Sequence, residues 1–227
     1  MTDEAVVVTG PDVTLEGRLG LPPGATGMVL FAHGSGSGRF SPRNSFVAEH
    51  LQRGGMATLL IDLLSEEEAE DRRMVFDIDL LADRVLLAAA WLKQDRRTAQ
   101  LPLGYFGAST GAAAALQAAA RSPEMVSAVV SRGGRPDLAE AYLPRVAAPT
   151  LLIVGGDDEP VIRMNQAAFR LLATTKELVI IPGASHLFEE PGTLEQVADH
   201  ALNWFHRHLA SSHARHAGST QEKETSR

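Results

Sequence analysis

The sequence predicts a doubly wound α/β fold, in which helices cover both faces of a mainly parallel, eight-stranded sheet. Short apolar runs alternate with longer segments of helical periodicity from residue 28 to residue 209. Several of these runs are apolar throughout, which is typical of central parallel strands that are covered on both faces. Such a sheet places its ligands beyond the carboxyl ends of its strands.

Each element follows from its local pattern. Two alternating segments separated by Gly10-Pro11 indicate an opening hairpin. The expected strands are residues 5–8, 13–19, 28–32, 57–61, 103–106, 126–130, 150–154 and 178–181. The expected helices are residues 44–53, 76–93, 110–121, 161–173 and 194–209. We therefore expect a single domain over residues 1–210 and a disordered polar tail over residues 211–227.

Composition excludes several classes of function. The 227 residues carry a net charge of −7 and include no cysteine, so thiolate nucleophiles and cysteine-based metal sites are excluded. No basic stripe indicates a nucleic-acid partner, and no apolar run is long enough to span a membrane. His206 and His208 lie two apart on a helix and do not share a face, so we expect no metal there. With no secretory signal, we expect a cytoplasmic protein without a cofactor, and the oligomeric state stays open.

The strongest local signal is Gly107-Ala108-Ser109-Thr110-Gly111. It matches G-x-S-x-G and stands between an apolar strand and an alanine-rich helix, which is the setting that a nucleophile elbow requires. The turn forces the serine into a strained backbone conformation beside the amino end of the following helix, where developing negative charge is stabilised. We predict Ser109 as the nucleophile. An idle serine in a glycine-rich turn is the alternative.

A serine hydroxyl needs a base, and the base needs an orienting acid. His186 lies in a loop of small residues directly after the last predicted strand, and we predict it as the base. His33 ends a strand and is more typical of a brace for the loop that follows. Asp158 follows the strand at residues 150–154 and is the preferred acid. Asp157 is the second choice, and Asp137 is a weaker one.

Taken together, these residues resemble the dienelactone hydrolase-like branch of the α/β-hydrolases, from about Val13 to Leu209. The resemblance rests on His33-Gly-Ser-Gly36, Gly107-Ala-Ser-Thr-Gly111, Gly155-Gly-Asp-Asp-Glu-Pro-Val161 and Gly183-Ala-Ser-His186. It implies an α/β-hydrolase fold, and it implies that the acid is the aspartate of a G-x-x-D-x-x-V stretch, here Asp158. It also implies a cysteine in the elbow, where this chain has Ser109, and this departure favours a serine esterase. The chain also resembles the hydrolase module that is found joined to phosphoribosyltransferases.

The oxyanion that forms when a carbonyl is attacked needs amide donors. In this fold they are the amide after the nucleophile, which is that of Thr110, and one amide from the loop after the third strand. Ser35 is the preferred second donor, and Gly36 is the other candidate. A flexible glycine-rich turn would explain the glycines but not their position next to the elbow.

The residues between Gly134 and Pro149 are too few for a lid domain, so an open cleft for small esters is expected. Arginines in loops near the carboxyl ends of the strands are candidates for binding an acidic substrate group. They are Arg39, Arg43 and Arg132, and surface pairing with nearby acids explains them equally well. The acidic run Glu66-Glu67-Glu68 with Glu70 is typical of a solvated helix start or loop.

The sequence thus predicts a serine hydrolase that cleaves small esters or lactones through an acyl-enzyme on Ser109. Two alternatives remain. The same triad could transfer the acyl group to another acceptor or cleave an amide, or the fold could be a binding module without catalysis.

Overall fold

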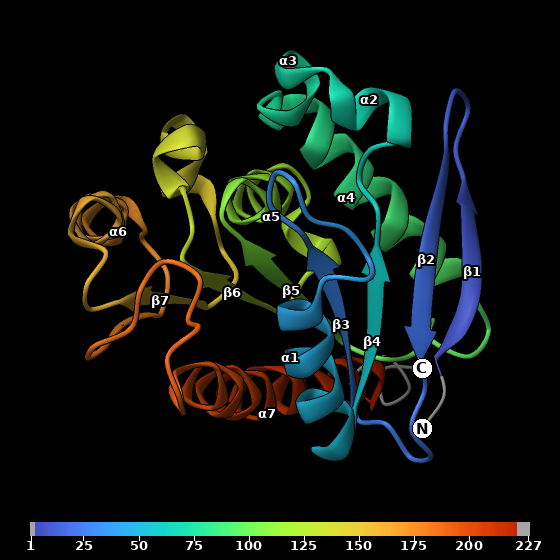
Figure 1. Cartoon of the computed structure of the whole chain (residues 1–227). Helices are drawn as coiled ribbons and strands as arrows, with labels where there is room; N and C mark the ends of the chain where they lie inside the picture. The colour runs from blue at the N-terminus through green and yellow to red at the C-terminus, as the bar shows by residue number, and fades with distance from the viewer. Residues whose placement is uncertain (1–2, 222–227) are drawn as a thin grey trace.

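The computed structural model describes residues 3–221, and side chains up to Leu209. Its centre is one eight-stranded sheet in the order β1-β2-β4-β3-β5-β6-β7-β8 (Figure 1). The strand pairs β1–β2 and β2–β4 are antiparallel, and all others are parallel. The strands are β1 (Glu4–Thr9), β2 (Thr14–Gly20), β3 (Gly27–Ala32), β4 (Met56–Ile61), β5 (Leu103–Ala108), β6 (Ala128–Arg132), β7 (Thr150–Gly155) and β8 (Lys176–Ile181). The mainly parallel eight-stranded sheet that the sequence predicts is confirmed.

The burial of each strand follows from its position in the sheet. Every residue of β3 to β7 is buried, because helices cover both faces of these central strands. β1 and the first half of β2 alternate between buried and exposed residues, since they form an antiparallel edge. β8 is the opposite edge and is only partly buried. The apolar and alternating runs in the sequence therefore distinguish central strands from the hairpin edge.

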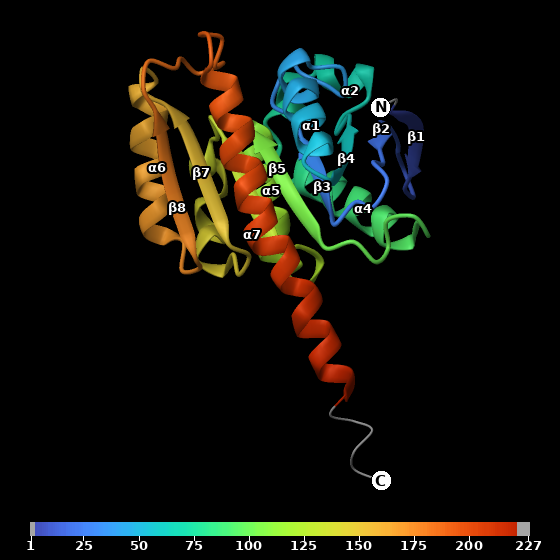
Figure 2. The ribbon, with the colours of Figure 1, turned by 90° about the horizontal axis from the view of Figure 1, so that it is seen from below.

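Five longer helices form the two outer layers (Figure 2). α1 (Pro42–Arg53) and α7 (Thr193–Gln221) pack against each other on one face of the sheet. α4 (Ile78–Gln94), α5 (Thr110–Arg121) and α6 (Glu159–Leu171) cover the other face. Each face has its own apolar core, one with Trp204 and Phe205 of α7 at its centre and the other with the alanine-rich α5. This layering leaves the carboxyl ends of the parallel strands as the common edge where loops meet.

The remaining helices are short. α2 (Glu66–Glu70) and α3 (Arg72–Val75) follow β4, and 3₁₀ helices η1 (Pro123–Met125) and η2 (Pro136–Arg145) flank β6. Ser65 and Glu68 form a reciprocal capping box at the start of α2, so part of the acidic run caps a helix. η2 fills the segment between Gly134 and Pro149, where the sequence predicts no lid domain. The two helices α2 and α3 stand above β4 in Figure 1 and form a wall that the sequence analysis does not anticipate.

The last helix is longer than expected. α7 continues to Gln221 instead of ending at residue 209, and Figure 2 shows its last turns extending beyond the sheet. The first part of the segment 211–227 is therefore helical backbone, whereas residues 222–227 lie outside the described residues. The disorder predicted for residues 211–227 and the single domain over residues 1–210 stay predictions.

Candidate active site

Ser109 occupies the strained turn that the elbow motif predicts. It joins β5 to α5 with φ 51° and ψ −123°, one of only two positive φ angles at non-glycine residues in the described part of the chain. Such a conformation costs on the order of 1–3 kcal/mol and persists only where the surroundings enforce it. Here the Ser109 amide donates to the Arg132 carbonyl at 3.3 Å, and the Ser109 carbonyl accepts from the Arg135 amide at 3.1 Å. The loop after β6 thus holds the backbone of the serine on both sides.

The two glycines of the motif allow this turn. A Cβ on Gly107 would overlap the backbone of Ala112 in the first turn of α5. A Cβ on Gly111 would overlap the carbonyl oxygens of Ala32 and His33 at the end of β3. Both positions require glycine because another backbone segment passes in direct contact. The motif therefore fixes the approach of three segments: β5, α5 and the loop after β3.

His186 and Asp158 are joined by a hydrogen bond between His186 Nδ1 and Asp158 Oδ2, 2.6 Å long. Asp158 ends the loop after β7, and its carboxylate is only 13% exposed, compared with 39% for the imidazole of His186. A short bond to a partly buried carboxylate holds the proton on Nδ1 and leaves Nε2 as the free acceptor. The pair can therefore accept a proton at Nε2, as a general base must.

The other two candidate acids lie elsewhere. Asp157 is exposed, and its backbone amide donates to the Ala184 carbonyl at 3.0 Å. Asp137 forms an ion pair with Arg135, 2.7 Å long. Of the three carboxylates considered from the sequence, Asp158 alone contacts His186.

The loop that carries His186 lies against the segment that holds Ser109. Gly133, with φ 51°, directly follows Arg132, whose carbonyl accepts the Ser109 amide. A Cβ on Gly133 would come within 3.5 Å of His186 Cε1, so the imidazole packs on this glycine. The three predicted triad residues therefore converge at the carboxyl ends of β5, β7 and β8.

The loop after β3 packs on the other side of Ser109. A Cβ on Gly34 would lie 2.8 Å from Ser109 Cβ. The next residue, Ser35, donates its amide to the Thr110 hydroxyl at 3.1 Å. The structure thus brings the two predicted oxyanion-hole residues into contact, but it shows the Ser35 amide engaged with a side chain. The Gly36 backbone has φ 67°, with open space where a Cβ would stand.

His33 acts as the brace that its position suggests. Its Nδ1 lies 2.9 Å from the Gly34 carbonyl, an acceptor, so this nitrogen carries the proton. Its Nε2 accepts the Leu63 amide at 3.0 Å. Burial lowers the pKa of His33, and this favours the neutral tautomer that makes both bonds. His33 therefore ties the loop after β3 to the loop after β4.

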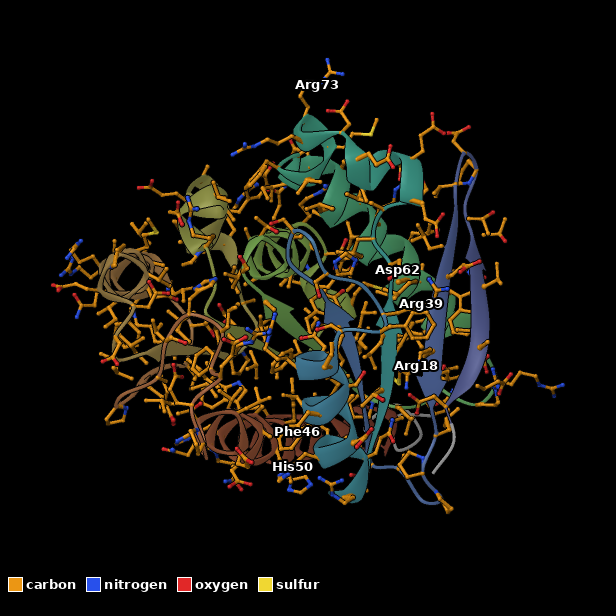
Figure 3. The ribbon with its side chains drawn as sticks, in the orientation of Figure 1. Arg18, Arg39, Phe46, His50, Asp62 and Arg73 are labelled. Atoms are coloured by element: carbon orange, nitrogen blue, oxygen red, sulfur yellow. The ribbon has the colours of Figure 1, made fainter. Side chains whose placement is uncertain are left out.

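Two of the three candidate arginines are paired with carboxylates. Arg39 contacts Asp62 and Glu16, and Figure 3 shows Arg39 and Asp62 side by side above β4. Arg43, at the start of α1, pairs with Glu189 at 3.2 Å in an exposed position. Both arrangements agree with the surface-pairing alternative.

Arg132 is different. Its side chain is buried, with the residue 5% exposed, and its Nη2 donates to Asn44 Oδ1 at 3.3 Å. Its Nε has no hydrogen-bond partner, and no carboxylate pairs with this guanidinium among residues 3–209. Burial lowers the pKa of Arg132 to about 10, and the positive charge of Arg43 acts in the same direction. The end of β6 thus carries a buried cation without a carboxylate partner, on the same residue whose carbonyl accepts the Ser109 amide.

A cavity lies beside Thr110 that was not predicted from the sequence. It has a volume of about 140 Å³, and its apolar wall consists of Leu64, Ala69, Val75 and Leu81. Ala69 stands in α2, inside the run of glutamates, and Val75 ends α3, after two arginines and a methionine. An isolated apolar residue inside a charged run was the available signal, and it is a weak one.

No group of histidine, aspartate and glutamate side chains within the described residues has the arrangement of a metal site. No helix in that part of the chain is both long and apolar enough to cross a membrane.

Comparison with known proteins shows the family of this chain and agrees with its fold. Residues 43–209 match the dienelactone hydrolase family. The chain belongs to this family. The crystal structure of a dienelactone hydrolase from Anabaena variabilis is 60% identical to it, with a TM-score of 0.89 over 92% of this chain and 98% of the other.

Solved structures of lower sequence identity share the fold alone. An α/β serine hydrolase without a lid from Xanthomonas campestris is 22% identical, with a TM-score of 0.70 over 91% of this chain and 95% of the other. Est1E from Butyrivibrio proteoclasticus, in a structure with bound ferulic acid, is 18% identical, with a TM-score of 0.80 over 91% of this chain and all of the other. Both likenesses agree with an α/β-hydrolase fold, and the Xanthomonas structure is the one described as lacking a lid.

Two curated proteins from strains of Mycobacterium tuberculosis are 56% identical over 207 residues and are provisionally named phosphoribosyl transferases. These residues are 91% of this chain but 46% of each relative, so the chain spans about half the length of the curated relatives it matches.

Proposed function

We propose that this member of the dienelactone hydrolase family is a serine hydrolase that cleaves small carboxylic esters or lactones through an acyl-enzyme on Ser109. The observation that carries the proposal is the 2.6 Å bond between Asp158 and His186, in loops that converge on a strained serine. A serine held at φ 51° by two backbone bonds is typical of a nucleophile, because an idle residue has no reason to occupy a costly conformation.

The reaction follows from the roles of these groups. His186 Nε2 accepts the Ser109 proton while the serine oxygen attacks the ester carbonyl, and Asp158 stabilises the imidazolium. The amide of Thr110, at the amino end of α5, donates to the oxyanion together with an amide of the Ser35 loop. The imidazolium then gives its proton to the leaving alcohol. His186 then accepts a proton from water as the water oxygen attacks the acyl-enzyme, and the imidazolium returns that proton to Ser109 Oγ as the acid is released.

The test is the variant Ser109→Ala. Ester hydrolysis and covalent labelling by a fluorophosphonate should both be lost, while the circular dichroism spectrum stays the same. The control is Ser122→Ala, at the opposite end of α5, which should be labelled and active like the wild type. Labelling of a folded Ser109→Ala protein would assign the nucleophile to another residue. A wild-type protein that is neither labelled nor active would favour a binding module.

A transferase or amidase using the same triad is distinguished by its products. Hydrolysis in the presence of added alcohols or amines should yield the free acid. Formation of a new ester or amide as the main product would favour acyl transfer.

Arg132 supports a second element of the proposal, which is a substrate with a carboxylate or phosphate group. A buried guanidinium without a carboxylate partner is costly, and an anion that reaches it would gain a charge-assisted hydrogen bond. Arg39 and Arg43 are weaker candidates, because carboxylates already pair with both.

The transferase name of the mycobacterial relatives does not extend to this site in our proposal. This chain matches 46% of their length, and we assign the name to the part that it does not match. A phosphoribosyl transfer assay on this chain should therefore show no activity.

A further inference from the structure

The cavity beside Thr110 gives the proposed substrate a more definite form. We propose that it binds the acyl group of the ester, and that this group is short, aliphatic and uncharged. The inference rests on the proposed serine hydrolase mechanism.

The cavity lies next to the reacting atoms. It is lined on one side by the loop from His33 to Ser37 and by Thr110, which also provide the proposed oxyanion donors. Gly34 in this lining is so close that a Cβ on it would stand 3.6 Å from Ser109 Oγ. A carbonyl group bound at Ser109 would therefore have one of its two substituents at the mouth of this cavity.

The position of His186 decides which substituent it is. The imidazolium must give its proton to the leaving alcohol, so the alcohol lies on the His186 side of Ser109. His186 packs on Gly133, after β6, whereas the cavity lies beyond the loop after β3. Since β5 separates β3 from β6 in the sheet, the acyl group lies on the cavity side.

The residues of the cavity wall determine which kind of acyl group the cavity binds. Leu64 and Leu81 are buried, and Val75 and Ala69 complete the wall from α3 and α2. Apolar surface of this kind gains free energy by removing aliphatic carbon from water, at roughly 25 cal/mol per Å². Aliphatic acyl groups therefore fit the wall best.

The volume limits the length of the chain. The cavity measures about 140 Å³. An engineered apolar cavity of roughly 150 Å³ in another protein takes one benzene, which is a six-carbon ring. Acyl chains of about four to six carbons should therefore fill it, and longer chains should extend beyond its apolar wall.

The neighbouring hollow excludes a negative charge at the end of the chain. This larger space, about 600 Å³, shares His33, Ser37, Leu64 and Ala69 with the cavity. Its lining includes four carboxylates, those of Glu16, Asp62, Glu66 and Glu67, and a single arginine, Arg39, which already contacts two of them. An acyl group that ended in a carboxylate would meet like charge there.

The experiment compares p-nitrophenyl esters from acetate to octanoate, together with the hemisuccinate. For the wild type, kcat/KM should peak between four and six carbons and fall at least tenfold at octanoate. The hemisuccinate should react at least tenfold more slowly than the butanoate, which has the same number of acyl carbons.

Val75 is the residue to change, because it stands on a short, partly exposed helix where a substitution leaves the core intact. Val75→Trp should fill the cavity and lower the ratio of kcat/KM for hexanoate to kcat/KM for acetate at least tenfold. Val75→Ala should move the optimum to longer chains. The matched control is Met74→Trp, an exposed neighbour outside the cavity lining, which should keep the wild-type profile.

Fluorophosphonate labelling separates the two proposals. If the wild type is labelled and hydrolyses acetate, but Val75→Trp leaves the chain-length profile unchanged, the acyl cavity is wrong and the serine hydrolase stands. A preference for the hemisuccinate over the butanoate would likewise overturn the acyl cavity and leave the serine hydrolase proposal standing. Loss of labelling and hydrolysis in the wild type overturns both.

Discussion

The groups on the two sides of Ser109 differ in their chemistry. On the side of β6 to β8 stand ionisable groups that are buried or hydrogen-bonded: the pair of Asp158 with His186, and the unpaired cation of Arg132. On the side of β3 and β4 stand backbone amides, the neutral brace His33 and an apolar cavity. In our proposal, proton transfer and the buried cation belong to one side, and the oxyanion donors and the acyl group to the other. Substitutions on the two sides should therefore change different kinetic parameters.

The largest effect is expected from Asp158→Asn on the ionisable side. An amide cannot stabilise the imidazolium and favours the wrong tautomer of His186, and a comparable change in other serine hydrolases lowers kcat about 10⁴-fold. Asp157→Asn removes the same charge from an exposed carboxylate and should change kcat less than threefold. Steady-state kinetics on one ester measures both. If Asp157→Asn proved the more damaging, the two roles would be exchanged.

The next comparison is between arginines on the two sides. Arg132→Met should reduce the preference for esters with an acidic alcohol group by about 10–100-fold in kcat/KM, because one charge-assisted bond contributes about 1.5–3 kcal/mol. Arg39→Met should leave this preference unchanged, since Asp62 and Glu16 already contact Arg39. The readout is the ratio of kcat/KM for matched acidic and neutral esters.

Stability separates a binding role of Arg132 from a structural one. Removing a buried charge that has no counter-ion should raise the free energy of unfolding in urea, or leave it unchanged. A destabilised Arg132→Met protein with an unaltered substrate preference would make the arginine a packing residue.

On the side of the amides, the Thr110 hydroxyl is expected to matter through Ser35. It accepts the Ser35 amide at 3.1 Å and so holds the loop beside the Thr110 amide. Thr110→Val removes this acceptor and should lower kcat roughly fivefold, the equivalent of one hydrogen bond of about 1 kcal/mol, with little change in KM. Thr110→Ser keeps the hydroxyl and should retain most of the activity. An equal loss in both variants would assign the effect to packing.

The features predicted from the sequence are those that short segments determine. All eight strands arise within two residues of the predicted positions. Burial on both faces is visible in the apolar runs of the central strands, and the antiparallel edge is visible in the alternating segments of the first two strands. Ser109 and Asp158 each follow the end of such a strand, so their positions could be predicted from local patterns, although their catalytic roles stay predictions.

The features that could not be predicted from the sequence depend on contacts between residues far apart in the chain. The buried guanidinium of Arg132 contacts Asn44, 88 residues earlier, and the ring of Phe188, 56 residues later. The Ser35 amide is engaged by a side chain 75 residues later. The cavity wall combines residues after β4 with residues of α2, α3 and α4, and in the sequence the glutamates of α2 dominate that segment. Only the packing of the two layers brings these groups together.

The smallest effect concerns the acid stability of the brace on the amide side. Burial is the largest cause that lowers the pKa of His33 below its ordinary value, against the smaller opposing influences of the Gly34 carbonyl and Asp62. The unfolded chain therefore binds a proton at His33 at a higher pH than the folded protein does, so protonation favours unfolding. This contribution to stability is present above the unfolded pKa of about 6.5 and is lost as the pH falls below it. Protonation also removes the acceptor for the Leu63 amide.

His33→Gln should therefore lose less stability than the wild type between pH 7.5 and pH 5, when the free energy of unfolding is measured in urea at each pH. The control is His200→Gln, an exposed residue of α7, which should follow the wild-type dependence. His33 holds the loop after β3, which carries the proposed oxyanion donor, and it does not contact His186. When the pH is lowered from 7.5 to 5, the rate of fluorophosphonate labelling should therefore fall more in the wild type than in His33→Gln. A wild-type stability that is as insensitive to this pH change as that of His33→Gln would contradict the neutral brace.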